Sequence, residues 1–216
     1  MKTWIPGVFL ALILAGCTTS APPQYKEMLV VGDAISCCAP IPKLGWNHDW
    51  GMAATERKND YAHRLCAELK KSSPDLKLTV DSIMYQDTMT GWVHLIPCSA
   101  DLIVIQLSEN YKGGISLEEY GDAYGQMIEE LCENGEKTVV CLGPWKNTQL
   151  EPVIARAAAN HGAVYLSLQG IRSDPANLAA ADGKYPKLGD MPGDLGMKKI
   201  AEAILNSLAD KTNNGR

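Results

Sequence analysis

The fold is decided by the stretch Asp101-Leu102-Ile103-Val104-Ile105-Gln106-Leu107, which is almost continuously apolar. Such a run is typical of a central strand in a parallel sheet, because helices cover both faces of that strand. Shorter apolar runs occur on both sides of it, and segments with helical periodicity separate them. The patterns predict four further strands at 28–31, 76–83, 138–142 and 163–166. They predict helices at 55–71, from the capping box at 116–119 to 134–135, at 149–160 and at 194–209.

This alternation predicts an α/β fold, a flavodoxin-like three-layer α/β/α sandwich around a five-stranded parallel sheet. Apolar residues make up 46% of the 216 residues and charged residues 21%, which is an ordinary globular composition. The net charge is −5, so the chain lacks the positive charge that a nucleic-acid-binding protein needs. Ligand sites in such sheets form beyond the carboxyl ends of the strands. The loops of interest therefore follow Val31, Leu107, Leu142 and Leu166.

The N-terminus has the composition of an export signal. Lys2 is followed by an apolar segment and small residues that end at Cys17, and the run Leu14-Ala15-Gly16-Cys17 resembles a bacterial lipobox. The resemblance implies that the Cys17 thiol is acylated, and the alternative is a cleaved signal beside a coincidental cysteine. We therefore expect a signal peptide at 1–16, a tether at 17–26, one domain at 27–210 and a flexible tail at 211–216.

The predicted location is extracytoplasmic, on a membrane that the chain contacts through its lipid anchor. Thr18 follows the anchor cysteine in place of the aspartate that retains some lipoproteins at the inner membrane, so we expect the outer membrane. Six of the seven cysteines remain after Cys17. They form either disulfides, with undetermined pairing, or buried thiols. The sequence has no C-x-x-C pair, and we expect neither a metal nor a cofactor. The six are Cys37, Cys38, Cys66, Cys98, Cys132 and Cys141.

Three segments carry a family resemblance when they are taken in order on this fold. They are Gly32-Asp33-Ala34-Ile35-Ser36, Ser108-Glu109-Asn110 and Met191-Pro192-Gly193-Asp194-Leu195-Gly196-Met197. Together with Gly45-Trp46-Asn47-His48-Asp49-Trp50-Gly51-Met52-Ala53-Ala54 and Gly143-Pro144-Trp145, they look like the SGNH (GDSL-type) hydrolase family. The resemblance covers nearly the whole mature chain and implies ester hydrolysis at the carboxyl edge of the sheet.

The resemblance also shows where the chain departs from the family. The family's nucleophilic serine corresponds to Ala34, and its histidine base corresponds to Met191. The aspartate that often precedes that base by three residues corresponds to Leu188. Asn110 matches the asparagine of the oxyanion hole, which the Ala34 N–H would join. In the third block Ser108 replaces a glycine, and Gly91 is the candidate for the glycine of the second block.

Other residues could replace the lost chemistry or bind a ligand. Ser36 is a candidate nucleophile, although a cap or turn hydroxyl is the favoured interpretation. His48 is a candidate base or an exposed loop residue, whereas His63 and His161 are expected to be structural. Trp46 and Trp145 are equally well explained as ligand-binding faces and as core residues. Trp50 is expected in the core, because a helix is predicted to begin beside it at Gly51-Met52.

The leading hypothesis is a catalytically impaired SGNH-like lipoprotein that binds an acylated or carbohydrate ligand. Its site would comprise Ala34, Asn110, Trp46 and Trp145. A second hypothesis is an active extracytoplasmic esterase or carbohydrate deacetylase with a rearranged nucleophile. A third is a structural envelope protein. The partner is therefore a small molecule or a glycan, and the ligand and the oligomeric state are not determined by the sequence.

Overall fold

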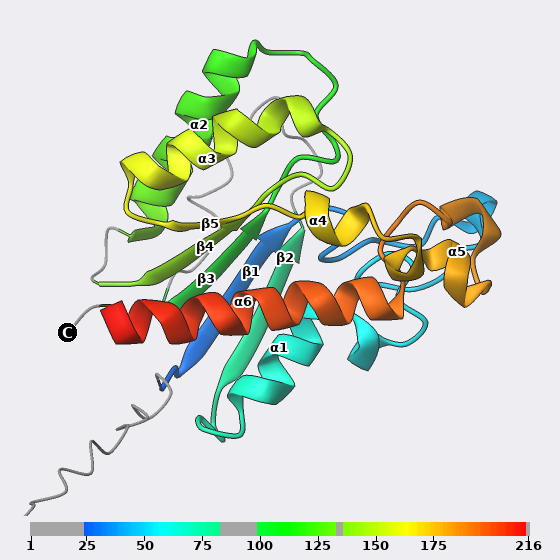
Figure 1. Ribbon diagram of the computed structural model, residues 1–216, viewed down its shortest axis with the longest axis horizontal. Coiled ribbons are helices and arrows are strands. Elements are labelled where there is room, and N and C mark those ends of the chain that lie inside the picture. The colour runs from blue at the N-terminus through cyan, green and yellow to red at the C-terminus, as the bar shows by residue number, and fades with distance from the viewer. Residues whose placement is uncertain (1–23, 83–98, 133–135, 215–216) are drawn as a thin grey trace, which may run out of the picture.

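The structure is a computed structural model that describes residues 24–82, 99–132 and 136–214. Its centre is a five-stranded parallel sheet with strand order β2-β1-β3-β4-β5 (Figure 1). The predicted strands are all present, with no end shifted by more than one residue. Their bounds are β1 Glu27–Gly32, β2 Lys77–Ser82, β3 Leu102–Gln106, β4 Thr138–Leu142 and β5 Val164–Leu166.

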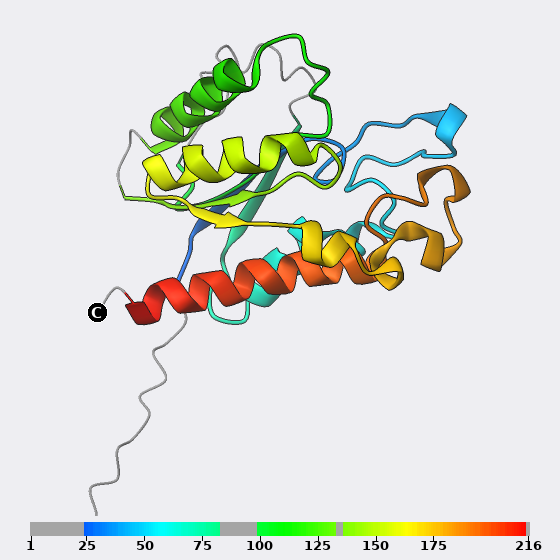
Figure 2. The same cartoon turned by 45° about the horizontal axis from the view of Figure 1, so that its top comes forward.

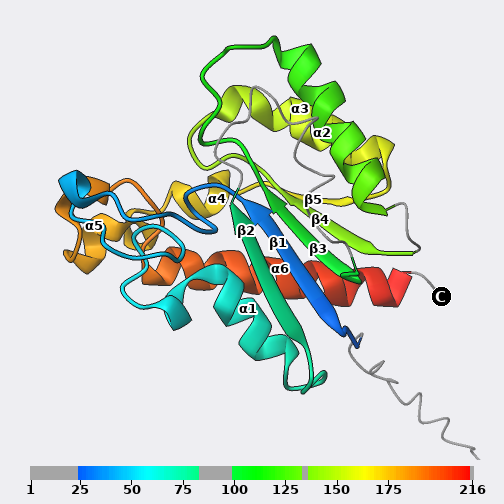
Figure 3. The ribbon, with the colours of Figure 1, turned by 180° about the vertical axis from the view of Figure 1, so that it is seen from behind.

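Helices cover both faces of the sheet, which confirms the three-layer α/β/α sandwich. Helices α2 and α3 pack together on one face, and α1 and α6 pack together on the other (Figures 1, 2 and 3). Two short helices, α4 and α5, lie between β5 and α6. The bounds are α1 Tyr61–Leu69, α2 Leu117–Cys132, α3 Glu151–Asn160, α4 Gln169–Arg172, α5 Ala179–Asp182 and α6 Asp194–Asn214.

Some helix ends differ from the predictions for local reasons. Helix α1 begins at Tyr61 rather than at 55, because the buried Asp60 caps it by accepting the His63 N–H. Helix α6 extends to Asn214, beyond the predicted domain boundary at 210, because no helix breaker precedes Gly215. The capping box before α2 is confirmed, since the N–H groups of Ser116 and Glu119 each donate to the other's side chain.

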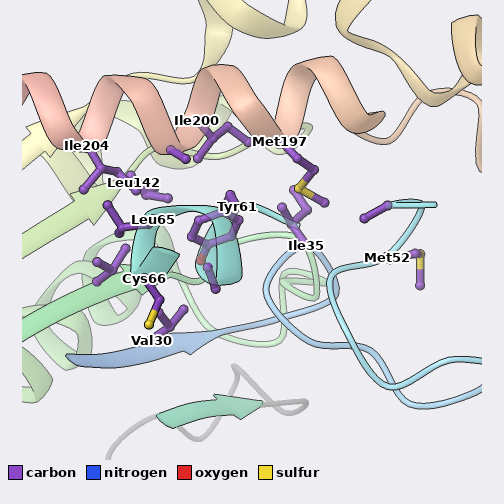
Figure 4. Close-up of a cluster of buried hydrophobic side chains, with 14 of the residues drawn as sticks. Val30, Ile35, Met52, Tyr61, Leu65, Cys66, Leu142, Met197, Ile200 and Ile204 are labelled. Carbon is purple, nitrogen blue, oxygen red and sulfur yellow. The ribbon is translucent and has the colours of Figure 1, made fainter. Parts of the chain in front are cut away.

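Two apolar cores flank the sheet. Alternate residues of the strands point to opposite faces, so Val30 packs under α1 and α6 while Ile103 and Ile105 pack under α2 and α3. Figure 4 shows the first core, where Tyr61 and Leu65 of α1 lie beside Ile200 of α6. The described chain contains no phenylalanine, and buried tyrosines and tryptophans supply the large side chains instead.

Several sequence predictions lie outside the described residues. These are the signal peptide, the acylated Cys17, most of the tether, Gly91, Cys98 and the helix end at 134–135. Within the ranges that the structure describes, no helix is both long enough and apolar enough to cross a membrane.

Candidate functional site

The loops after β1 and β3 are joined at the carboxyl edge of the sheet by Asp33. Its side chain is fully buried and accepts the N–H of Ser108 at 3.1 Å and that of Glu109 at 2.6 Å. The Asp33 N–H also donates to the carbonyl of Gln106 at 3.1 Å. Because Ala34 follows Asp33 and Asn110 follows Glu109, the two positions that correspond to the family's serine and asparagine lie on hydrogen-bonded loops.

Glu109 extends this network to the other side of the edge. Its carboxylate accepts the N–H of Trp145 at 2.7 Å and that of Lys146 at 3.1 Å. The Trp145 indole N–H in turn donates to the carbonyl of Asp190 at 2.8 Å, next to Met191. Burial raises the pKa of the Glu109 carboxyl, and the nearby charge of Asp33 raises it further, while the backbone N–H donors oppose the shift. A single polar network therefore links the four loops of the predicted site.

Ala34 lies in the tight turn that follows β1. The N–H groups of Ser36 and Cys37 both donate to the Asp33 carbonyl at 2.9 Å, and the Ala34 carbonyl accepts the Met52 N–H at 2.8 Å. The Ala34 methyl group is half-buried against the core under α1 and α6. This turn has a fixed backbone but no nucleophilic side chain at its apex.

Asn110 is half-buried, and its side-chain amide makes no hydrogen bond to any described residue. An amide in this state has both a donor and an acceptor left for a ligand.

Met191 lies in the apolar core rather than at the surface of a cleft. Its exposure is 5%, it belongs to the same buried cluster as Leu188 and Trp145, and its carbonyl accepts the Ala179 N–H. A thioether cannot accept a proton at neutral pH, and Leu188 offers no carboxylate to orient a base. Apolar packing thus occupies the place where the family resemblance implies a histidine and its partner.

Ser36 is 1% exposed, and its hydroxyl lies 2.6 Å from the Tyr61 hydroxyl inside the core. It turns back over β1 into space that exists only because Gly32 has no side chain, since a Cβ at Gly32 would collide with Ser36 Oγ. This placement agrees with the structural interpretation of Ser36 and does not suit a nucleophile that must meet a substrate.

His48 and the tryptophans form an aromatic group beside the site. The half-buried His48 ring stacks on Trp50 with centroids 4.0 Å apart, and it meets Trp46 edge-on. Trp46 and Trp145 are 0% exposed, and their indole N–H groups donate to the backbone carbonyls of Cys38 and Asp190. The structure therefore favours the core interpretation for both tryptophans, because neither ring face is open to a ligand.

Trp50, which was expected in the core, packs against the core under α1 and α6 but is only half-buried. Its indole N–H donates to the Ala54 carbonyl at 3.1 Å. The prediction that a helix begins at Gly51-Met52 is wrong, because these residues form a bend and a turn.

The cysteines of the predicted site region are thiols rather than disulfides. Cys37, Cys38, Cys66 and Cys141 are all unbridged. Burial raises the pKa of the Cys38 thiol to about 11 and that of Cys141 to about 12, so both are protonated at neutral pH. Across residues 24–82, 99–132 and 136–214 there is no group of three or more His, Cys, Asp or Glu side chains able to hold a metal ion.

Comparison with solved structures identifies the class of fold. The esterase EstA from a Pseudoalteromonas species superposes with a TM-score of 0.58 at 13% identity, over 87% of this chain and 99% of that chain. A protein of the lipolytic G-D-S-L family from Desulfitobacterium hafniense gives a TM-score of 0.56 at 13% identity, over 84% of this chain and 98% of that chain. A two-domain esterase active on acetylated mannans gives 0.59 at 16% identity, over 87% of this chain and 51% of that chain.

This chain therefore has an SGNH-hydrolase-like α/β fold and is structurally similar to SGNH/GDSL esterases. It spans about half the length of the two-domain esterase. No family model and no curated protein sequence matches it.

Two features of the edge were not anticipated from the sequence. Asp33 and Glu109 act as loop clamps, and the signal for them was only that Asp33 directly follows β1 and Glu109 comes three residues after the end of β3. The pair Asp60 and His63 was also missed: His63 Nδ1 lies 2.8 Å from the fully buried Asp60 carboxylate. Their spacing of three residues at a helix start was the available signal.

Proposed function

We propose that this protein is a catalytically impaired SGNH-fold lipoprotein that binds an acylated carbohydrate at the former active site. The observation that carries the proposal is the contrast at the carboxyl edge. The clamps Asp33 and Glu109 hold the loops in place, whereas Ala34 and Met191 occupy the positions of the nucleophile and the base.

The chemistry of these positions supports binding rather than turnover. Ester hydrolysis by such a triad needs a nucleophile and a base in contact, and losing either costs on the order of 10³- to 10⁶-fold in rate. Neither proposed substitute is well placed: Ser36 is bonded to Tyr61 inside the core, and His48 is stacked on Trp50. The proposed oxyanion donors, in contrast, are retained. The Ala34 N–H and the Asn110 amide can still donate to an ester carbonyl without attacking it.

The ligand class is proposed from the same geometry together with the fold comparison. A carbonyl oxygen accepts hydrogen bonds from N–H groups, so an O-acyl group is the ligand that the proposed donors Ala34 and Asn110 would bind. An esterase with this fold is active on acetylated mannans, which makes acetylated oligosaccharides the first ligands to try. The strand β1 begins at the edge of the sheet opposite the site (Figure 1). An anchor before β1 at Cys17 would therefore leave the site facing away from an outer membrane.

The test compares binding and turnover in one set of variants. Calorimetric titration with acetylated mannan oligosaccharides should show binding that the deacetylated oligosaccharides lack. Asn110→Ala should weaken that binding about tenfold, because it removes one hydrogen bond. Asn160→Ala is the control. Asn160 is the exposed last residue of α3 and lies on none of the site loops. It should leave the affinity within about twofold.

Turnover is measured with p-nitrophenyl acetate and the same oligosaccharides. The wild-type chain should be inactive, and Ala34→Ser combined with Met191→His should gain activity. Turnover by the wild type that Ser36→Ala abolishes would establish the rearranged esterase instead. Absence of both binding and turnover would favour the structural envelope protein.

A further inference from the structure

A groove lies beside β2, next to the loop that carries Ala34. It has a volume of about 750 Å³ between α1 and the edge strand β2. A volume of this size is ordinary for a small-molecule site. Ser36, Cys37 and Trp50 line it, whereas Ala34, Asn110 and Met191 do not. The groove therefore adjoins the candidate site, and an inference that uses neither Ala34 nor Asn110 does not depend on the proposed function.

The floor of the groove is apolar and lies at the edge of the sheet, where β2 is the outermost strand. Leu78 and Val80 alternate along β2, with Leu76 just before it, and so share the face of the sheet that α1 covers. Leu78 and Val80 are only half-buried, and with Cys66 of α1 they line the groove. An apolar strip about as long as three strand residues is left open to a ligand.

The α1 wall carries polar groups in the same register. His63 and Lys70 are seven residues apart and so lie on one helix face, with Cys66 between them. His63 Nδ1 is held by Asp60, whose carboxylate is itself fixed because it also accepts the N–H groups of His63 and Gly51. Nε2 has no hydrogen-bond partner in the described part of the chain. Because Nδ1 donates to Asp60, Nε2 donates to an anionic head in the imidazolium form of the ring, in which both nitrogens carry a proton.

Most charges around the groove are already paired. The carboxylate among its described lining residues, Asp49, pairs with Arg57 at 2.5 Å, and Lys77 pairs with Glu27 at 3.8 Å. The buried Asp60 carboxylate lies behind His63. Lys70 forms no ion pair with any described residue, so its ammonium group at one end of the apolar floor is left for an anionic head.

We propose that this groove binds an anionic amphiphile: an acyl chain on the floor of Leu78, Val80 and Cys66, with a phosphate or carboxylate head held by His63 and Lys70. Charge complementarity selects an anionic head, and the apolar strip selects an extended chain. The proposed occupant is a single-chain anionic lipid, whose head His63 and Lys70 recognise and whose chain lies on the apolar floor.

The test measures how far a bound ligand protects a cysteine thiol of the groove from alkylation, in the full chain as the cell produces it. Cys37 lines the groove and is half-buried, so the rate of its alkylation by iodoacetamide can be followed by peptide mass spectrometry. Octyl phosphate should slow the alkylation of Cys37 in a saturable manner. Octyl glucoside, which has the same chain without the charge, should give little protection. Inorganic phosphate alone shows whether the head suffices without the chain.

Paired lysine variants make the test specific. Lys70→Gln should raise the octyl phosphate concentration for half-protection about tenfold, since it removes one charge-assisted contact. Lys71→Gln is the matched control, because Lys71 pairs with Glu68 and does not line the groove; it should change that concentration by less than about twofold. His63→Gln should weaken protection in the same direction as Lys70→Gln.

The proposal would be overturned if octyl glucoside protected Cys37 as well as octyl phosphate does, or if octyl phosphate gave no protection. It would also be overturned if Lys70→Gln and Lys71→Gln changed the half-protection concentration equally. Protection by inorganic phosphate as strong as that by octyl phosphate would also overturn it, because the apolar floor would then have no role. Binding of acetylated oligosaccharides at Asn110 bears on none of these outcomes, so the two proposals fail independently.

Discussion

The loops after β1 and β3 are held by buried hydrogen bonds, whereas the segment before α6 is held by apolar packing. In the first region the Asp33 carboxylate accepts two backbone N–H groups from the neighbouring loop. In the second, Leu188 and Met191 are buried with Trp145 in the core. The difference teaches that a carboxylate which joins two loops stabilises the fold even in a protein without catalytic activity. At position 191 an apolar side chain is more stabilising than a polar catalytic group would be, because the position is buried.

The comparison is tested most strongly at Met191. Met191→Ala should lower the free energy of unfolding by about 3 kcal/mol, because it leaves a cavity in a packed core. Urea unfolding of the chain measures this loss. Leu195→Ala, at a 40% exposed position on the first turn of α6, is the control and should change stability by less than about 0.5 kcal/mol. A cost for Met191→Ala as small as that of the control would contradict the apolar-core account.

The polar region is tested at Asp33. Asp33→Ala should cost about 2 kcal/mol, because the N–H groups of Ser108 and Glu109 lose a buried acceptor. Asp190→Ala removes a carboxylate from the same edge, but that carboxylate is 63% exposed and its pair with Lys146 is solvated. It should therefore cost less than about 1 kcal/mol. Urea unfolding compares the two variants, and equal costs would show that Asp33 does not act as a clamp.

A smaller effect should appear in the pH dependence that Glu109 imposes. Its pKa is raised by burial and then by Asp33, so the folded chain holds this proton more tightly than the unfolded chain. The resulting stability is fully present below the unfolded pKa near 4.5 and is lost as the pH rises through the folded pKa. Between about pH 4 and 7, wild type should lose on the order of 1 kcal/mol relative to Glu109→Gln in urea unfolding.

Glu119 provides a control of opposite sign for that measurement. Hydrogen bonds from Ser116 lower the pKa of the exposed Glu119 carboxyl. Its contribution is therefore present above the unfolded pKa and is lost on acidification. Glu119→Gln should change the slope of stability against pH in the direction opposite to Glu109→Gln, and slopes of the same sign would contradict the assignment of both groups.

The strands and most helices were predictable because each has a characteristic pattern of apolar and polar residues along the chain. The run 102–106 is apolar at every position apart from Gln106, which a strand covered on both faces requires. The capping box at Ser116 and Glu119 likewise needs only neighbours in the chain. Helices α4 and α5 were not predicted, since each has four residues and is too short to show a helical period.

The candidate site was predictable in position but not in detail. The family resemblance placed Ala34 and Asn110 at the carboxyl edge, where the structure has them on joined loops. Burial of the tryptophans could not be read in the same way. Whether the Trp145 ring faces solvent depends on the segment near Asp190, which lies 45 residues further along the chain.

The sequence by itself determined the α/β class and the order of its elements, because these depend on residue type and local periodicity. The family resemblance added only that Ala34 and Met191 correspond to the family's serine and histidine. Only the tertiary structure decided which polar groups are clamped, which rings are buried and that His63 and Lys70 border an open groove beside β2. The reason is physical: burial and hydrogen-bond partners are set by contacts between segments distant in the chain. The sequence of either segment alone does not specify those contacts.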